Sequence, residues 1–229
     1  DPKNPSWPER DWLICSKGHA GPAVYAALAL KGYFPLEELS TLNKPGTNLP
    51  SHCDRNKTPG IDMTTGSLGQ GASLAVGVAL GHRLDKRDNY TYLILGDGEL
   101  QEGQVWEAAM LAAHHGLDRL IAFVDYNKQQ LDGYVRDIND PGDISGKFES
   151  FGWNAYKADG RDVADILDRI KSAKLAKGKP SVIVLDTIKG QGCTFAEGKL
   201  DNHHMTISRE QAEEALAVLY KELEEVTGQ

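Results

Sequence analysis

Two short apolar runs, each ending abruptly in polar residues, constrain the fold of this chain more than any other feature. The first, Tyr92-Leu93-Ile94-Leu95, stops at Gly96-Asp97-Gly98, and a helical pattern follows. The second, Leu120-Ile121-Ala122-Phe123-Val124, stops at Asp125-Tyr126-Asn127. Runs of this length predict β-strands, and the helix between them makes the two strands parallel. We therefore expect the polar residues to lie at the carboxyl ends of neighbouring strands, where open α/β sheets bind ligands.

The turn after the first run has the residue types of a site for a phosphate and a cation. Its glycines allow the backbone to approach a bulky anion, and the helix start behind it offers unpaired N–H groups. The Asp97 carboxylate fits beside a phosphate if a cation such as Mg²⁺ or Ca²⁺ lies between them. A Gly-Asp-Gly segment alone is also an ordinary turn. The oxygen that Asn127 offers at the end of the next strand favours the functional interpretation.

The rest of the chain continues the alternation of strands and helices. Trp153 to Tyr156, Val163 to Leu175 and Ser181 to Asp186 read as strand, helix and strand. This rhythm predicts an α/β fold, a doubly wound parallel sheet with helices on both faces. Helical patterns also run from Ser16 to Gly32, from Ala72 to Leu84, from Glu102 to His115 and, after a capping box, from Ser208 to Val226, and we assign the last helix to packing.

Composition limits the classes of function. With 229 residues and 40% hydrophobic content, the chain is long enough for one domain, residues 1–229, with its own core. The net charge of −8 argues against nucleic acid and anionic membranes as partners, and no apolar run approaches the ~18 residues of a membrane span. Three scattered cysteines favour the reducing cytoplasm. Because the chain opens without Met in the loop-like segment 1–8, we expect an N-terminal segment to precede it.

The central motif resembles one known family. Gly-Asp-Gly followed about thirty residues later by Asn resembles the thiamine diphosphate motif, and Gly-Asp-Gly-Glu-Leu-Gln-Glu-Gly-Gln-Val-Trp-Glu-Ala-Ala is similar to the transketolase version. The resemblance runs from about Asp11 to about Met205. It implies thiamine diphosphate and Mg²⁺ (or Ca²⁺) as cofactors, with Asp97, Asn127 and the backbone carbonyl of Gln129 as metal ligands. Lys128 stands where the family commonly has Gly, which affects the local loop.

The same resemblance implies further residues around the cofactor. The segment Thr64 to Gly71 is similar to a family segment that touches the cofactor through its main chain, although Ser67 replaces Pro. Glu102 matches a glutamate that couples two active sites across the interface between subunits, and a first-turn Glu also stabilises a helix through its dipole. The residues expected to contact the cofactor are Gly66, Leu68, Gly96, Asp97, Gly98, Glu99, Asn127 and His203.

Three histidines occupy positions that the resemblance makes catalytic. His19 lies in Ser-Lys-Gly-His, similar to a family Ser-Asn-Gly-His, and a His at a helix start is otherwise more often a polar cap. His52 lies within a loop, Asn43 to Asp62, that is too long for a simple connection. His203 matches a family histidine better than His204 does, although Asn202 replaces an aromatic residue. Imidazoles suit proton transfer near neutral pH.

The resemblance also implies that part of the enzyme lies outside this sequence. Thiamine enzymes of this kind need a glutamate from a pyrimidine-binding domain, and the chain ends before such a domain. We therefore expect a diphosphate-binding subunit of a split transketolase, assembled with a pyrimidine-domain chain as a dimer of heterodimers. Its reaction would transfer a two-carbon ketol unit from a ketose phosphate to an aldose phosphate. The alternatives are a fragment of a full-length enzyme, a subunit resembling deoxyxylulose phosphate synthase or a ketoacid dehydrogenase α chain, and a non-catalytic cofactor-binding subunit.

Overall fold

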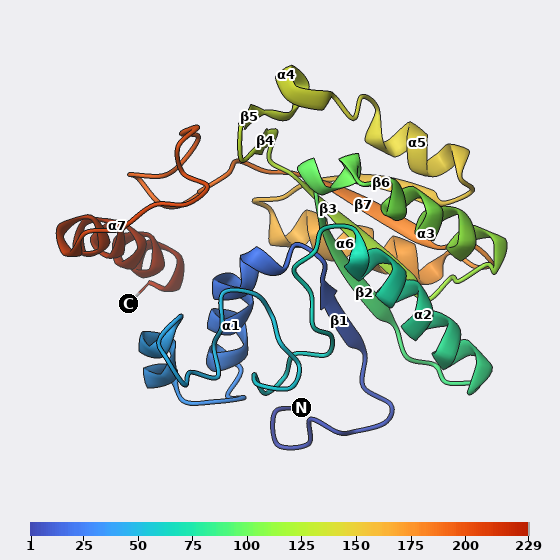
Figure 1. Cartoon of the computed structure of the whole chain (residues 1–229), viewed down its shortest axis with the longest axis horizontal. Helices are drawn as coiled ribbons and strands as arrows, with labels where there is room; N and C mark the ends of the chain where they lie inside the picture. Colours follow the sequence, from blue (N-terminus) through green and yellow to red (C-terminus); the bar gives the residue numbers. More distant parts are fainter. Residues whose placement is uncertain (229) are drawn as a thin grey trace.

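A five-stranded parallel sheet forms the centre of the protein (Figure 1). A computed structural model of the chain describes residues 1–228. The strands lie in the order β1-β2-β3-β7-β6. Their bounds are β1 (Trp12–Cys15), β2 (Thr91–Gly96), β3 (Leu120–Tyr126), β6 (Asn154–Asp159) and β7 (Ser181–Asp186), and a small antiparallel hairpin joins β4 (Gln129–Gln130) to β5 (Gly133–Tyr134).

Helices cover both faces of this sheet (Figure 1). One face packs against α2 (Gln70–Leu84), α3 (Gly103–His114) and α5 (Ile144–Ser150), and the other packs against α6 (Val163–Leu175). The remaining helices are α1 (Gly21–Leu30), α4 (Val135–Asn139) and α7 (Arg209–Thr227). Strands buried on both faces need apolar residues at successive positions, which is why β2 and β3 read as continuous apolar runs. The predicted doubly wound α/β fold is confirmed.

The path of the chain explains where a site can form. The chain passes from β1 to β2 to β3 in one direction, then crosses to the outer strand β6 and returns to β7. Because crossovers are right-handed, this reversal puts α2 and α3 on one face and α6 on the other. The loops after β3 and β7 diverge at the point of reversal. A doubly wound sheet binds its ligands at this edge.

A second, smaller core fixes the loop that carries His52. Tyr25 from α1 packs with Leu49 and Cys53 of the loop, and all three side chains are buried. The Tyr25 hydroxyl donates a hydrogen bond of 2.8 Å to the carbonyl of Pro50. The long loop between residues 43 and 62 thus has a core of its own, although no helix or strand is assigned within it.

Close packing of α2 against the end of β1 depends on a glycine. A Cβ atom at Gly71 would lie 2.4 Å from the Ser16 Oγ and 2.6 Å from the Ser16 Cα, whereas a Cβ at Gly77 meets nothing within 4 Å. We expect Gly71→Ala to lower the free energy of unfolding by about 2–3 kcal/mol through overpacking. The control Gly77→Ala, in the same helix, should raise it by about 0.5–1 kcal/mol. Urea unfolding measures both, and equal effects would contradict the packing described.

Three elements differ from the sequence-based expectations. β1 was not predicted; it occupies residues directly before the expected helix start at Ser16, so the helical segment begins later, with a short 3-10 turn η1 (Gly18–Ala20) before α1. The capping box at Ser208 is present, but α7 buries only Ala215 and leaves Leu219 and Leu223 exposed, so the assignment of this helix to packing was wrong within the described chain. Over residues 1–228, no helix has the length and apolar character needed to cross a membrane.

Candidate functional site

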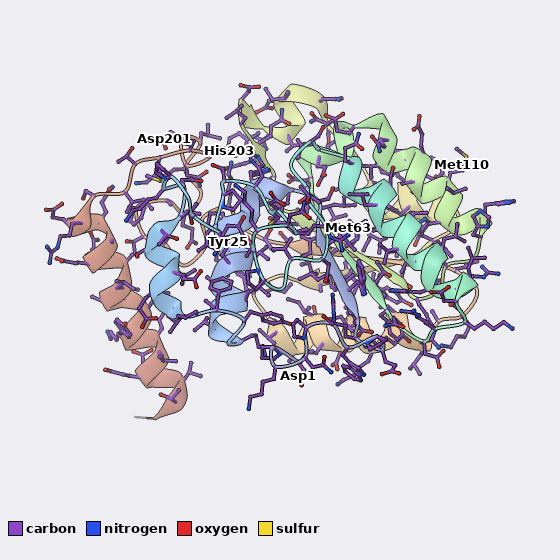
Figure 2. The ribbon with its side chains drawn as sticks, turned by 60° about the horizontal axis from the view of Figure 1, so that its bottom comes forward. Asp1, Tyr25, Met63, Met110, Asp201 and His203 are labelled. Carbon is purple, nitrogen blue, oxygen red and sulfur yellow. The ribbon has the colours of Figure 1, made fainter. Side chains whose placement is uncertain are left out.

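A cavity of about 530 Å³ lies at the carboxyl ends of β2 and β3 and gathers most of the predicted site residues. His203, labelled in Figure 2, reaches it from the loop between β7 and α7. Gly66 and His52 are not among its lining residues; they lie against each other, since a Cβ at Gly66 would be 3.1 Å from the His52 ring. The predicted residues that line the cavity are His19, Leu68, Gly96, Asp97, Gly98, Glu99, Glu102, Asn127, Gln129 and His203.

A larger hollow of about 930 Å³ lies nearby, over the ends of β3, β6 and β7. It contains none of the predicted site residues. Two of its cationic side chains are already paired, Lys128 with Asp186 and Arg161 with Asp159. We therefore assign the candidate site to the smaller cavity, where buried polar groups converge.

Asp97 is a buried carboxylate at the centre of the cavity. Its side chain is 1% exposed and accepts hydrogen bonds from the backbone N–H groups of Gly98 (2.8 Å) and Lys128 (2.6 Å). No Lys, Arg or His in residues 1–228 forms an ion pair with it. Burial raises the pKa of Asp97 to about 6. A buried carboxylate without a countercharge is costly, and a bound cation would provide that charge.

A network around Asp125 orients Asn127. The Asp125 carboxylate binds the Lys17 ammonium and the Thr187 hydroxyl, which lie beyond the ends of β1 and β7. The Asn127 side-chain N–H donates to Asp125 at 3.1 Å, and its Oδ1 accepts from the N–H of Gln129 at 3.0 Å. Burial raises the pKa of Asp125, but Lys17 outweighs it, so the net shift is downward and the carboxylate stays charged. The amide of Asn127 is therefore held with its oxygen toward the turn at Gln129.

The donor set fits a hard divalent cation that shares phosphate oxygens. Asp97 offers a carboxylate, Asn127 an amide oxygen and Gln129 a backbone carbonyl on the same turn. Mg²⁺ typically binds one or two carboxylates and completes its octahedron with water and phosphate oxygens. Zinc-like clusters of three or more His, Cys, Asp or Glu do not occur in residues 1–228. The chemistry of the side chains thus agrees with Mg²⁺ or Ca²⁺ beside a diphosphate.

Glu99 holds the walls of the cavity together. It lies in the 3-10 turn η3 (Gly98–Gln101) and is 2% exposed. Its Oε1 accepts hydrogen bonds from the Ser16 hydroxyl (2.5 Å) and the Gly69 N–H (2.8 Å), and its Oε2 accepts from the Gly96 N–H (3.1 Å). These partners come from the end of β1, the start of α2 and the end of β2. Both oxygens of a residue predicted to contact the cofactor are thus bound to the protein itself.

Two histidines face each other across the cavity. The rings of His19 and His203 lie 5.2 Å apart, and the Lys189 Nζ lies 2.7 Å from the Nδ1 of His203. Burial, followed by the charge of His203, lowers the pKa of His19 to about 4, and burial followed by Lys189 also lowers the pKa of His203. Both imidazoles are therefore neutral near pH 7, where they act as hydrogen-bonding groups rather than cations.

Sequence reasoning gave no site role to Lys17, Asp125 and Lys189, all of which line the cavity. Each follows a strand of the parallel sheet within a few residues, Lys17 after β1, Asp125 at the end of β3 and Lys189 after β7. That position was the available signal, since polar residues at the carboxyl ends of parallel strands converge. His204 is exposed and is not among the lining residues, so the geometry favours His203 of the two.

Comparison with known proteins identifies the family. The family described as transketolase, thiamine diphosphate binding domain, matches residues 1–220. The chain belongs to the transketolase family. Among curated relatives of this transketolase chain is a 6-deoxy-6-sulfo-D-fructose transketolase subunit of Clostridium sp. (strain MSTE9), 58% identical over 97% of this chain and 81% of the relative. One of the two subunits of an apulose-4-phosphate transketolase from Actinobacillus succinogenes is 40% identical over 97% of this chain and 80% of that relative.

Solved transketolases share the fold but are much longer. The transketolase of Campylobacter jejuni superposes with a TM-score of 0.87 at 33% sequence identity, over 94% of this chain. That match covers only 35% of the solved chain. This transketolase chain therefore spans most of the length of the relatives named as subunits and about a third of the solved one. The family predicted from the Gly-Asp-Gly motif and its surroundings is confirmed.

Proposed function

We propose that this chain is the diphosphate-binding subunit of a two-chain cytoplasmic transketolase that transfers a two-carbon ketol unit. The observation that carries the proposal is the single cavity where Asp97 and Asn127 meet His19 and His203 at the carboxyl ends of the strands. Coverage of about four-fifths of relatives named as subunits supports a separate partner chain. That partner carries the pyrimidine-binding domain and its glutamate, and two such pairs form a dimer of heterodimers in which Glu102 lies at the interface.

In this proposal the cavity holds thiamine diphosphate together with Mg²⁺. Asp97, Asn127 and the Gln129 carbonyl bind the metal, and the backbone from Gly96 to Glu99 and near Leu68 faces the cofactor. When bound, the cofactor supplies the nucleophilic carbon and the electron sink for carbon–carbon cleavage. His19, His52 and His203 hold and move protons at substrate oxygens. Neutral imidazoles suit this role because they can both donate and accept.

The donor we favour within this class is a ketose with an anionic end group, 6-deoxy-6-sulfofructose. The relative named for that sugar is 58% identical to this chain, whereas the relative named for apulose 4-phosphate is 40% identical. Both named substrates are ketoses with an anionic group, so a ketose phosphate is the competing donor. The acceptor is an aldose phosphate.

Ketol transfer by the mixed subunits tests the proposal. The chain and a candidate pyrimidine-domain chain are assayed separately and together with thiamine diphosphate and Mg²⁺, using glyceraldehyde 3-phosphate as acceptor. We expect activity only in the mixture, with kcat/KM at least tenfold higher for 6-deoxy-6-sulfofructose than for fructose 6-phosphate. A reversed ratio would assign a ketose phosphate donor. Cofactor binding without turnover of either donor, in a complex shown to assemble, would contradict the enzymatic proposal.

The raised pKa of Asp97 gives a direct test of the metal site. In the chain alone, the carboxyl ¹³C signal of Asp97 should titrate with a midpoint near pH 6, because burial raises its pKa to about 6. Saturating Mg²⁺ and thiamine diphosphate should move the midpoint below about pH 5, since a metal ligand must be deprotonated. His19, with a pKa of about 4, stays neutral across most of this range. An unchanged midpoint would remove Asp97 from the metal site.

A further inference from the structure

The contact between Lys189 and His203 is unusual because it joins two groups that both carry protons. Lys189 follows β7, and His203 lies on the same loop before α7. The Nζ of Lys189 is 2.7 Å from the Nδ1 of His203, inside the cavity. Across residues 1–228, Lys189 forms no salt bridge with an Asp or Glu, unlike Lys17, which pairs with Asp125. Its ammonium is thus free to act on the imidazole.

We propose that Lys189 is a positioning residue that fixes His203 in the tautomer with its proton on Nε2. A lysine ammonium has three N–H donors and no acceptor, so the Nδ1 that faces it must offer a lone pair. A neutral imidazole whose Nδ1 is an acceptor carries its proton on Nε2. The same contact disfavours the imidazolium, because that form would place a second N–H and a second positive charge against the ammonium.

The surroundings of the pair agree with this assignment. Burial, followed by the charge of Lys189, lowers the pKa of His203, which keeps the ring neutral at pH 7. His19 lies beside it with a ring separation of 5.2 Å and is also neutral, so it adds no repulsion. No side chain or backbone group of residues 1–228 forms a hydrogen bond with the Nε2 of His203. That nitrogen is therefore available to a molecule in the cavity.

The consequence for chemistry rests on the proposed function. A fixed Nε2–H gives the cavity a neutral proton donor, directed at an oxygen of the bound substrate, whereas the other tautomer would present a lone pair there. Lys189 would then act through His203 rather than on the substrate itself. Loss of a correctly oriented acid–base group typically costs about 10²–10⁴-fold in rate. Loss of its orientation alone should cost less, about tenfold to a hundredfold.

Selective ¹⁵N-histidine labelling and two-dimensional NMR of the whole chain test the tautomer directly. At pH 7.5 we expect the Nε2 of His203 to show the shift of a protonated nitrogen and its Nδ1 that of an unprotonated one. Lys189→Met removes the donor and should bring both signals toward intermediate shifts. Lys189→Gln, whose amide can still donate to Nδ1, should keep the Nε2–H tautomer. The backbone amide spectrum shows whether each variant remains folded.

Lys17→Met is the matched control, because it removes another lysine of the same cavity that pairs with Asp125 instead of His203. It should leave the His203 tautomer unchanged. An Nδ1–H tautomer in the native chain would overturn the proposal. So would an unchanged Nε2–H tautomer in a folded Lys189→Met variant.

Kinetics of the assembled enzyme separate this inference from the proposed function. With 6-deoxy-6-sulfofructose as donor, Lys189→Met should lower kcat about tenfold to a hundredfold with a smaller change in KM, and Lys189→Gln should recover most of that loss. Equal losses in the two variants would limit Lys189 to a role as a positive charge and overturn its action through His203. Absence of ketol transfer by the native complex would contradict the proposed function, while the NMR result would still decide the tautomer.

Discussion

Asp97→Asn should weaken Mg²⁺-dependent binding of thiamine diphosphate by more than about 100-fold and reduce ketol transfer by the assembled complex to background. The carboxylate is the one negative charge we assign to the metal, and even residues behind a metal ligand contribute about 10- to 100-fold to affinity. An asparagine keeps the shape but loses the charge and one of the two acceptors that bind Gly98 and Lys128. Calorimetric titration of cofactor in the presence of Mg²⁺ measures the loss.

The same substitution should leave the unliganded chain about as stable as the native one. Burial raises the pKa of Asp97 from 3.8 to about 6, so between these values the folded state binds more protons than the unfolded state. Stability therefore falls as the pH rises through this window, and above pH 6 the charged carboxylate costs the fold about 3 kcal/mol. Asparagine avoids that cost but loses a hydrogen bond worth about 1–3 kcal/mol. The two effects nearly cancel at pH 7.

Asp132→Asn is the matched control, because it makes the same charge change at an exposed position of the same cavity. It should change cofactor affinity by less than about threefold. If Asp97→Asn bound cofactor as well as Asp132→Asn did, the assignment of the metal site would be wrong. A large loss of stability in Asp97→Asn at pH 7 would instead contradict the cost assigned to the buried charge.

Glu99→Ala should lower the free energy of unfolding by about 4 kcal/mol, the largest stability effect we expect from one side chain near the cavity. The substitution leaves three donors without an acceptor, the Ser16 hydroxyl and the N–H groups of Gly69 and Gly96. Each unsatisfied buried donor costs about 1–3 kcal/mol, and removal of the buried carboxylate, whose pKa burial raises, offsets part of the sum. Urea unfolding at pH 7 measures the difference.

Glu99→Gln keeps the test decisive if the alanine variant fails to fold. The glutamine oxygen can still accept from Ser16 and Gly69, while its amide group faces the N–H of Gly96 as a second donor. We expect a loss of about 1–2 kcal/mol, clearly smaller than that of alanine. Equal losses for the two variants would show that volume, rather than hydrogen bonding, is what Glu99 contributes.

The parts of the fold that could be predicted are those set by local sequence. β2, β3 and β7 are buried on both faces and therefore read as uninterrupted apolar runs, and α6 begins and ends at the predicted residues. The ligands Asp97 and Asn127 were found because each directly follows such a run. β1 was missed because its four residues, an edge strand with an exposed Leu13, carry too little pattern to distinguish from a loop.

The parts that could not be predicted depend on contacts between distant residues. Glu99 was expected to contact the cofactor, and its partners Ser16 and Gly69 come from segments that only the folded sheet brings to it. Lys189 meets His203 because the loop after β7 folds back on itself. The exposed apolar side chains of α7 show the opposite error: an amphipathic pattern predicts a buried face but does not say which surface covers it.

The order of strands in the sheet also sets the order in which the cavity can form during folding. Thr91 pairs with Leu120 through a helix-length connection, whereas Trp12 pairs with the same Thr91 only after the chain has closed a loop several times longer. Longer loops lose more entropy on closure and form contacts more slowly. We therefore expect β1 to join the sheet after β2 and β3 have paired. The hydrogen bond from Ser16 to Glu99 then forms late, and cofactor affinity becomes a readout of the last step of folding.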